Sequence, residues 1–239
     1  MMKSKLVLIR YLKRSFLRLG IHQFIPAKFL IKLGYISLLS KWIRKNKNIG
    51  YTSFPYNGFN SKLREGLYNY LIKTQSLDDE IDYLEFGVAK GTSFKWWMKN
   101  IHHKDAQFNG FDTFTGLPED WGHFKKGDMS SNNQQPKIDD NRHQFHQGLF
   151  QVTLPQFLEN YTGHKRKVIH LDADLFSSTL FVLTSLSPYL KPGDILIFDE
   201  FNVPLDEFKA FKVWVDSYYI NYQVLGEANN FYQTAIRIE

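Results

Sequence analysis

The sequence has no cysteine among its 239 residues. This absence excludes a disulfide framework, a thiol nucleophile and a thiolate metal site. Long apolar runs are missing too, since none approaches the ~20 residues of a membrane-spanning helix. The early apolar block at residues 6–9 is shorter than the ~7–15-residue core of a signal peptide. We therefore expect a cytoplasmic protein that is soluble or peripheral at a membrane.

Acidic residues are absent from residues 1–50, which contain twelve Lys and Arg residues. The net charge of +6 thus originates in this segment, because the rest of the chain has 18 basic and 24 acidic residues. Apolar residues at helical spacing predict an amphipathic helix over residues 3–19 and a second helix over residues 26–43. Those of the first helix are Leu8, Leu12, Phe16 and Leu19.

Two interpretations of this basic extension stay open. A basic amphipathic helix pair can bind an anionic membrane surface or an acidic partner. Alternatively, the helices cap the rest of the chain or form the arm of a homo-oligomer, since apolar helix faces usually pack on protein.

A third absence concerns glycine. A strand is expected at residues 83–86, and the turn from Gly87 to Gly91 leads into a helix that Thr92 or Ser93 can cap. The turn lacks glycine at the third and sixth positions of the dinucleotide-binding fingerprint, which disfavours a nicotinamide oxidoreductase. A glycine turn at a helix N-terminus still lets a ligand approach the backbone. Simple chain reversal is the other interpretation.

Acidic residues stand at the ends of three expected strands. Asp112 follows the strand at residues 106–111 and lies about 25 residues after Gly87, a distance at which a carboxylate accepts hydrogen bonds from ribose hydroxyls in nucleotide-binding α/β units. Further strands at residues 168–171 and 195–198 end in one or two acidic residues each. Because the carboxyl ends of parallel strands share one edge of the sheet, we expect a ligand site there.

The acidic residues of the two later strands are Asp172, Asp199 and Glu200. Oxygen-only ligands favour a hard cation such as Mg²⁺, because clustered carboxylates repel one another unless a cation or a proton lies among them. Without a metal ion, one of the three should have a raised pKa. The alternative is that they serve only as helix caps and turn formers. Asp174 is expected to cap the next helix or to assist, and His170 to pack within its strand.

Three other stretches carry weaker signals. Residues 48–60 are aromatic and rich in turn formers, so they form either a lid over the ligand edge or a plain linker. The polar stretch 113–142 predicts a lid or binding loop, in which Trp121, His123 and Phe124 are candidates for substrate contact. Thr153 is expected to cap a helix, since Pro155 follows in its first turn.

Four stretches, taken together, resemble the macrocin O-methyltransferase family of class I S-adenosylmethionine-dependent methyltransferases. They are LEFGVAKGTS, GFDTFTGLPEDW, GLFQVTLP and HLDADLFSST followed by LKPGDILIFDEF, in the same order as in that family and within residues 83–201. The resemblance implies a Rossmann-like α/β fold whose mostly parallel central sheet has an antiparallel closing strand. It divides the chain into a basic helical extension with a possible lid, residues 1–60, and a methyltransferase domain, residues 61–239.

The resemblance also implies roles for individual residues. Those expected to bind the methionine part of S-adenosylmethionine are Glu85, Gly87, Gly91, Thr92 and Ser93. Asp112 would bind the ribose, and Gln147 and Gly148 would lie near the adenine. Asp172, Asp199 and Glu200 match the positions that bind a divalent metal ion, usually magnesium, with Asp172 also as the catalytic proton acceptor. The family commonly has two aspartates where this chain has Asp199 and Glu200.

The expected reaction is methylation of a hydroxyl group on a small molecule, a sugar or another polyol. A catalytically inactive relative that binds a membrane surface or a protein partner through its basic N-terminus is the alternative, although Asp112 and the three carboxylates argue against it. Nucleic acid is not expected as a partner, because the chain beyond residue 50 is acidic overall and would repel phosphates.

Overall fold

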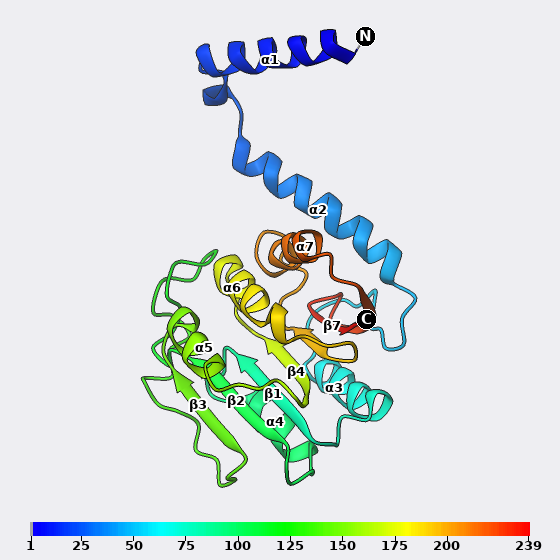
Figure 1. The fold of residues 1–239 in the computed structure, drawn as a ribbon, viewed down its shortest axis with the longest axis vertical. Coiled ribbons are helices and arrows are strands. Elements are labelled where there is room, and N and C mark those ends of the chain that lie inside the picture. The colour runs from blue at the N-terminus through cyan, green and yellow to red at the C-terminus, as the bar shows by residue number, and fades with distance from the viewer. Residues whose placement is uncertain (1) are drawn as a thin grey trace.

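The computed structural model describes residues 2–239, with side chains from Lys5 onward. Helices cover both faces of a seven-stranded sheet, and an N-terminal extension projects from one side (Figure 1). The strands are β1 (Ile81–Phe86), β2 (Gln107–Asp112), β3 (His143–Gln147), β4 (Arg166–Leu171), β5 (Ile195–Phe198), β6 (Tyr222–Ala228) and β7 (Gln233–Ile238). The α-helices are α1 (Met2–Arg18), α2 (Ala27–Asn46), α3 (Ser61–Gln75), α4 (Thr92–Asn100), α5 (Phe150–Leu158), α6 (Phe176–Leu186) and α7 (Glu207–Tyr218). Short 3-10 helices lie at Ile21–Phe24 and Ser187–Tyr189.

The strands of the sheet follow the order β3-β2-β1-β4-β5-β7-β6. Strands β1 to β5 are parallel, whereas β7 runs antiparallel between β5 and β6. This arrangement confirms the predicted Rossmann-like methyltransferase fold with its antiparallel closing strand. The order reverses between β1 and β4, so a crevice for a ligand is expected at the carboxyl ends of these strands.

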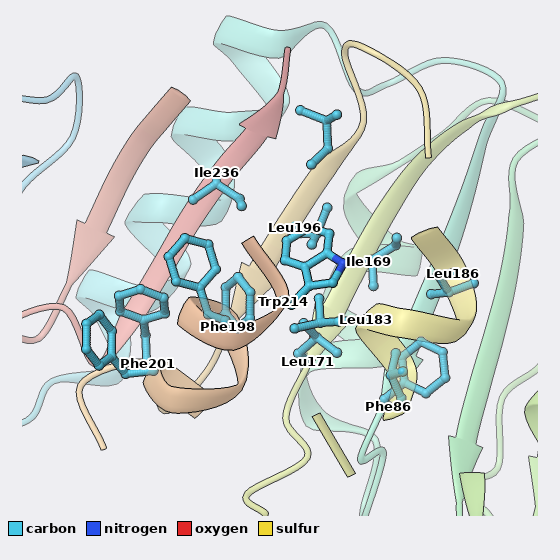
Figure 2. Packing of buried hydrophobic residues seen from close by; sticks show 14 of the residues in the cluster. Phe86, Ile169, Leu171, Leu183, Leu186, Leu196, Phe198, Phe201, Trp214 and Ile236 are labelled. Atoms are coloured by element: carbon cyan, nitrogen blue, oxygen red, sulfur yellow. The ribbon is translucent and has the colours of Figure 1, made fainter. Parts of the chain in front are cut away.

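The central strands are buried on both faces, which explains why β5 is a continuous apolar run. Strands β1 and β4 also carry buried charged or polar residues, such as Glu85 and His170. Alternate residues enter two separate cores, one on each face of the sheet. In the core beneath α6 and α7, Trp214 packs among Ile169, Leu183 and Leu196 (Figure 2). The opposite core lies beneath α3 and α4 and is centred on aromatic residues such as Trp97.

Two helix starts differ from the expected ones. Helix α4 is preceded by Gly91 in the left-handed conformation, so neither Thr92 nor Ser93 caps it. Helix α5 begins at Phe150, and Thr153 lies inside it with its hydroxyl bonded to the carbonyl of Leu149 at 3.2 Å. In both places the backbone geometry after a glycine positions the helix, and the polar side chain finds another acceptor.

The extension is only partly attached to the sheet domain. Leu39 and Trp42, in the second half of α2, are buried. The Trp42 ring lies 4.7 Å from that of Phe201, and its Nε1–H donates to the Tyr222 hydroxyl at 2.9 Å. This half of α2 caps the domain, as one interpretation predicted, whereas α1 and the first half of α2 point away from it (Figure 1). None of the described helices is both long and apolar enough to span a membrane.

Residues 48–60 run along the free edge of β6. Tyr51 forms a bridge with Gly226, and its carbonyl accepts the Glu227 amide at 2.9 Å. The buried Glu227 carboxylate accepts hydrogen bonds from the Thr52 hydroxyl at 2.7 Å, the Phe54 amide at 2.8 Å and the Ser53 amide. The segment is thus tied to the sheet edge, and the division of the chain at residue 60 stays a prediction.

Candidate functional site

A cavity of about 520 Å³ opens at the carboxyl ends of β1, β2, β4 and β5. Its walls come from the turn after β1, the polar loop after β2, the start of α5 and the ends of β4 and β5. Six of the predicted site residues line it, namely Gly87, Thr92, Ser93, Asp112, Asp172 and Glu200. All of residues 48–60 are described, and none of them lines the cavity.

The turn after β1 requires glycine at its first position. Gly87 has φ +98°, and a Cβ atom there would lie 1.8 Å from the carbonyl oxygen of Asp172. The Gly87 amide also donates to the carbonyl of Phe111 at 2.9 Å. The backbone segments that follow β1, β2 and β4 therefore come together at Gly87. Gly87 itself lines the cavity.

Glu85 lies behind this turn and is fully buried. It accepts hydrogen bonds from the Ser93 hydroxyl, at 2.7 Å, and from the Tyr83 hydroxyl. Glu85 therefore links β1 to the first turn of α4, where Ser93 lines the cavity. Gly91 is not among the described residues that line the cavity, and a Cβ atom added there would lie 2.7 Å from the Pro136 ring.

Asp112 lines the cavity with its carboxylate fixed by the backbone. One oxygen accepts the Ala89 amide at 2.7 Å and the other accepts the Phe114 amide at 2.6 Å. A carboxylate has about four acceptor positions, so two stay free for hydroxyl donors. Asp112 therefore lies at the cavity with acceptor positions to spare, and its contact with a ribose stays a prediction.

Gln147 and Gly148 are not among the described residues that line the cavity. The Gln147 side chain is exposed and bonds to Asn133 and to Gln135 instead. The next three residues line the cavity in their place, namely Leu149, Phe150 and Gln151. Their position directly after β3 was the available signal, since the chain crosses the ligand edge of the sheet there.

The polar loop borders the cavity through other residues than those expected. The cavity is lined by Gly116, Leu117, Pro118, Met129 and Ser130 of this loop. Trp121 and Phe124 stack on each other with ring centroids 5.4 Å apart. Neither of them, nor His123, is among the described lining residues, so the loop contributes aliphatic and backbone surface.

Three carboxylates face one side of the cavity, namely Asp172, Asp174 and Glu200. Burial and the neighbouring charges of Asp199 and Asp174 raise the pKa of Asp172 well above its usual range. Burial raises the pKa of Asp174 to about 6, and burial with the charge of Asp174 raises the pKa of Glu200 to about 8. The expectation of a raised pKa in this cluster is confirmed. Asp174 does not cap α6, whose N-cap is Leu175.

Asp199 differs from these carboxylates because cationic groups face it. Arg64 of α3 lies 3.3 Å from one oxygen, and His170 lies 3.7 Å from the other. Burial opposes ionisation of Asp199, but the bonds and charges of His170 and Arg64 outweigh it and lower its pKa. Arg64 lines the cavity and was missed in the sequence, where nothing near α3 indicates a partner in β5.

His170 is fully buried within β4, as expected, and a carboxylate lies near each of its ring nitrogens. Burial alone would lower its pKa, but Asp199 and Glu85 raise it to about 9. Nδ1 lies 2.8 Å from the Tyr83 hydroxyl and Nε2 lies 3.3 Å from the Tyr68 hydroxyl. The His170 ring therefore lies between Glu85 of β1 and Asp199, which directly follows β5.

The described residues contain no group of three or more His, Asp or Glu side chains that could hold a metal ion. The two oxygens of Asp199 face Arg64 and His170, and Glu200 accepts a hydrogen bond from the Tyr232 hydroxyl at 2.6 Å. The expected magnesium ligands Asp172, Asp199 and Glu200 are therefore not brought together as a metal site among the described residues, and magnesium binding stays a prediction.

Comparisons with known proteins agree with this geometry. Residues 84–201 match a family described as a methyltransferase domain. The calicheamicin methyltransferase CalS11 is similar in structure, with a TM-score of 0.56 and 19% identity over 89% of this chain and 93% of that chain. The O-methyltransferase NovP has a TM-score of 0.54 and 17% identity over 87% of this chain and 98% of that one.

A third similar structure is the O-methyltransferase TomG from Streptomyces achromogenes, solved in complex with S-adenosylmethionine. Its TM-score is 0.51, with 12% identity over 85% of this chain and 88% of that chain. No curated protein sequence matches this chain. The chain thus has the class I methyltransferase fold, its residues 84–201 match a methyltransferase domain, and the comparisons do not single out the macrocin family.

Proposed function

We propose that this chain is an S-adenosylmethionine-dependent O-methyltransferase that acts on a hydroxyl group of a sugar or another polyol in a small molecule. The observation that carries the proposal is the composition of one cavity. Its first wall holds the Gly87 turn and Asp112, which suit a nucleoside-containing cofactor. The cavity also holds three carboxylates of raised pKa, Asp172, Asp174 and Glu200, which suit a hydroxyl acceptor.

The acceptor class rests partly on structural neighbours. An apo structure of CalS11 is described as a TDP-rhamnose 3'-O-methyltransferase, and it covers 86% of this chain with a TM-score of 0.52. Carboxylates suit sugars, because each carboxylate oxygen can accept a hydrogen bond from a hydroxyl group. Several acceptor atoms on one wall can orient two neighbouring hydroxyls at once.

S-adenosylmethionine, when bound, supplies an electrophilic methyl group on a sulfonium ion, and S-adenosylhomocysteine remains after transfer. The Gly87 turn would leave room for its methionine part, and Asp112 would accept the hydrogen bonds of its ribose. Asp172 is the proposed proton acceptor for the acceptor hydroxyl, since it lines the cavity and its pKa is raised. A proton acceptor works best when its pKa lies near the operating pH.

The remaining charged residues would position the acceptor. Asp174 and Glu200 would hold a neighbouring hydroxyl, while Arg64 keeps Asp199 ionised and paired below them. We assign no step to a metal ion, because Asp199 faces Arg64 and His170, and one oxygen of Glu200 already accepts a hydrogen bond from the Tyr232 hydroxyl. The loop residues Leu117 and Met129 would shield the reaction from water.

The cofactor part of the proposal is tested by calorimetric titration of S-adenosylmethionine into the protein and into Asp112→Asn, with NAD as a second ligand. We expect binding of S-adenosylmethionine only, weakened about 10- to 100-fold in the variant, because a charged hydrogen-bond acceptor is lost. Asp120→Asn is the matched control, since Asp120 is exposed on the loop and pairs with Lys125. Binding of NAD alone, or equal losses in both variants, would overturn the assignment.

The acceptor part has a separate test. Release of S-adenosylhomocysteine is measured with glycosides and nucleotide sugars on one side and catechols on the other. Product from a sugar, lost in Asp172→Asn while cofactor binding persists, is the expected result. Product from a catechol and none from any sugar would overturn the acceptor class and leave the methyltransferase assignment intact.

A further inference from the structure

Residues 5–33 present an unusually large exposed apolar surface. Leu8 and Leu12 of α1 are each 57% exposed, and Leu19 after it is 72% exposed. Other large apolar side chains of α1 and the first half of α2 are also exposed, including Ile9, Leu17, Phe24, Phe29, Ile31 and Leu33. An exposed apolar patch of this size on a folded protein usually marks a binding surface.

The charges of the same segment are of one sign. Residues 1–33 contain eight Lys and Arg residues and no Asp or Glu. On α1, successive residues are rotated by about 100°, so Arg10 and Arg14 lie on the side opposite Leu8 and Leu12. Helix α1 is therefore a basic amphipathic helix whose two faces are both exposed.

We propose that residues 5–33 bind the surface of a bilayer that contains anionic lipid, with the apolar face of α1 at the acyl boundary and the basic side chains among the headgroups. An amphipathic helix with Lys and Arg on its polar face and Leu, Ile and Phe on the other binds in this way. Each basic residue near an anionic surface adds to the attraction.

Charge decides between a bilayer and a second copy of the chain. Pairing two of these segments would bury their apolar faces but would bring eight like charges against eight. An anionic bilayer offers apolar and negatively charged surface together, so it satisfies both faces of α1. The inference does not depend on the reaction proposed above.

The attachment of α2 agrees with this orientation. Trp42 fixes the second half of α2 to the domain, with its ring 5.8 Å from that of Phe231 and 4.7 Å from that of Phe201. The first half of α2 and α1 project beyond the domain (Figure 1). No described residue before Arg64 lines the cavity, so a bilayer bound at α1 leaves the cavity open.

Co-sedimentation with vesicles tests the proposal on the full chain. The vesicles contain phosphatidylcholine alone or an equimolar mixture with phosphatidylglycerol. We expect binding to the mixture only, and weaker binding at high salt, because the Debye length falls from about 10 Å at 0.1 M to about 3 Å at 1 M. The triple variant Arg10→Gln, Lys13→Gln, Arg14→Gln should bind about 100-fold more weakly.

Two further variants separate the contribution of the apolar face of α1 from that of its positive charges. Leu8→Gln with Leu12→Gln should weaken binding at least about tenfold, because two apolar side chains leave the acyl boundary. A triple control with the same charge loss, Lys62→Gln, Lys73→Gln, Lys99→Gln, changes exposed lysines of the domain and should bind like the unaltered chain. All variants should keep the thermal unfolding temperature, since α1 packs mainly against the adjoining residues 21–24.

Three outcomes would overturn the proposal. One is no vesicle binding, and another is equal binding to both vesicle types. The third is a dimer in light scattering that Leu8→Gln with Leu12→Gln dissociates while vesicle binding is absent, since the apolar surface then serves a second copy.

Discussion

Buried charges in this protein are balanced by neighbouring side chains. Lys167 and Asp194, both almost fully buried, lie 3.1 Å apart on adjacent segments of the sheet. The same holds around His170, where Glu85 lies 3.5 Å from Nδ1 and Asp199 lies 3.7 Å from Nε2. Breaking such a buried pair is costly, because the remaining charge stays desolvated.

The charge of His170 predicts a specific pH dependence of stability. Its pKa is raised from 6.5 to about 9 in the folded protein, so the folded state binds the proton more tightly than the unfolded state. The resulting stability is fully present below pH 6.5 and is lost as the pH rises through about 9. The free energy of unfolding should fall with a slope of up to about 1.4 kcal/mol per pH unit in this window.

Urea unfolding at several pH values measures this slope. Glu200 also has a raised pKa, but it is present in both the unaltered protein and His170→Gln. The difference between the two slopes therefore gives the contribution of His170. The variant should lose most of the slope assigned to His170, whereas the control His164→Gln, an exposed site, should keep it. Identical slopes in all three proteins would show that His170 is neutral in the fold.

The acidic residues of the site were easier to predict from the sequence than its basic residue. Asp112, Asp172 and Glu200 were predicted, because each follows a recognisable strand and the carboxyl ends of parallel strands share an edge. Arg64 was not, because its partner Asp199 is 135 residues away in the chain. Only the packing of α3 against the sheet brings the two together.

The turn after β1 lies in close contact with the backbone at the end of β4, so a larger side chain at Gly87 should destabilise the fold. Gly87→Ala adds a Cβ atom 1.8 Å from the Asp172 carbonyl oxygen at φ +98°. We expect a loss of more than about 3 kcal/mol in the free energy of unfolding, because backbone must shift to relieve the overlap. Urea denaturation followed by circular dichroism measures the loss.

The matched control is Gly122→Ala. Gly122 also has a positive φ, +56°, but an added Cβ would meet nothing within 4 Å. Its cost should be only about 1–2 kcal/mol, from the left-handed conformation alone. Similar losses at the two glycines would show that the contact with Asp172 relaxes easily.

The strands were easier to predict than the helix starts. Short, largely apolar stretches indicated β1, β4 and β5, because strands covered on both faces are mostly apolar. Helices α4 and α5 begin where a glycine changes the direction of the chain, after Gly91 and shortly after Gly148. Ser93 and Thr153, which resembled caps, form other hydrogen bonds, to Glu85 and to the carbonyl of Leu149.

For the molecule as a whole, α2 is the connection between extension and domain. Trp42→Ala should lower the free energy of unfolding by about 3–5 kcal/mol, as expected for a buried tryptophan. Phe29→Ala, on the same helix but 59% exposed, should change it by less than about 0.5 kcal/mol. Chemical denaturation compares the two variants, and equal losses would contradict the division of α2 into an attached and a projecting half.

That division was not evident from the sequence. Apolar residues lie on several sides of α2, so periodicity cannot tell Leu39, which is buried, from Leu38, which is 44% exposed. The predicted sheet and its antiparallel closing strand were correct, because they depend on local patterns. The packing of a helix on a distant surface depends on that surface, here the aromatic cluster around Phe201.

The segment that follows α2 covers a sheet edge that could otherwise pair with another molecule. A strand at the edge of a sheet presents unpaired amide and carbonyl groups that can template aggregation. At the β6 edge, Tyr51 pairs with Gly226 and three donors from residues 52–54 surround Glu227. This short stretch of chain occupies the edge of the sheet, so the protein shields one of its two outer strands from strand addition by another molecule.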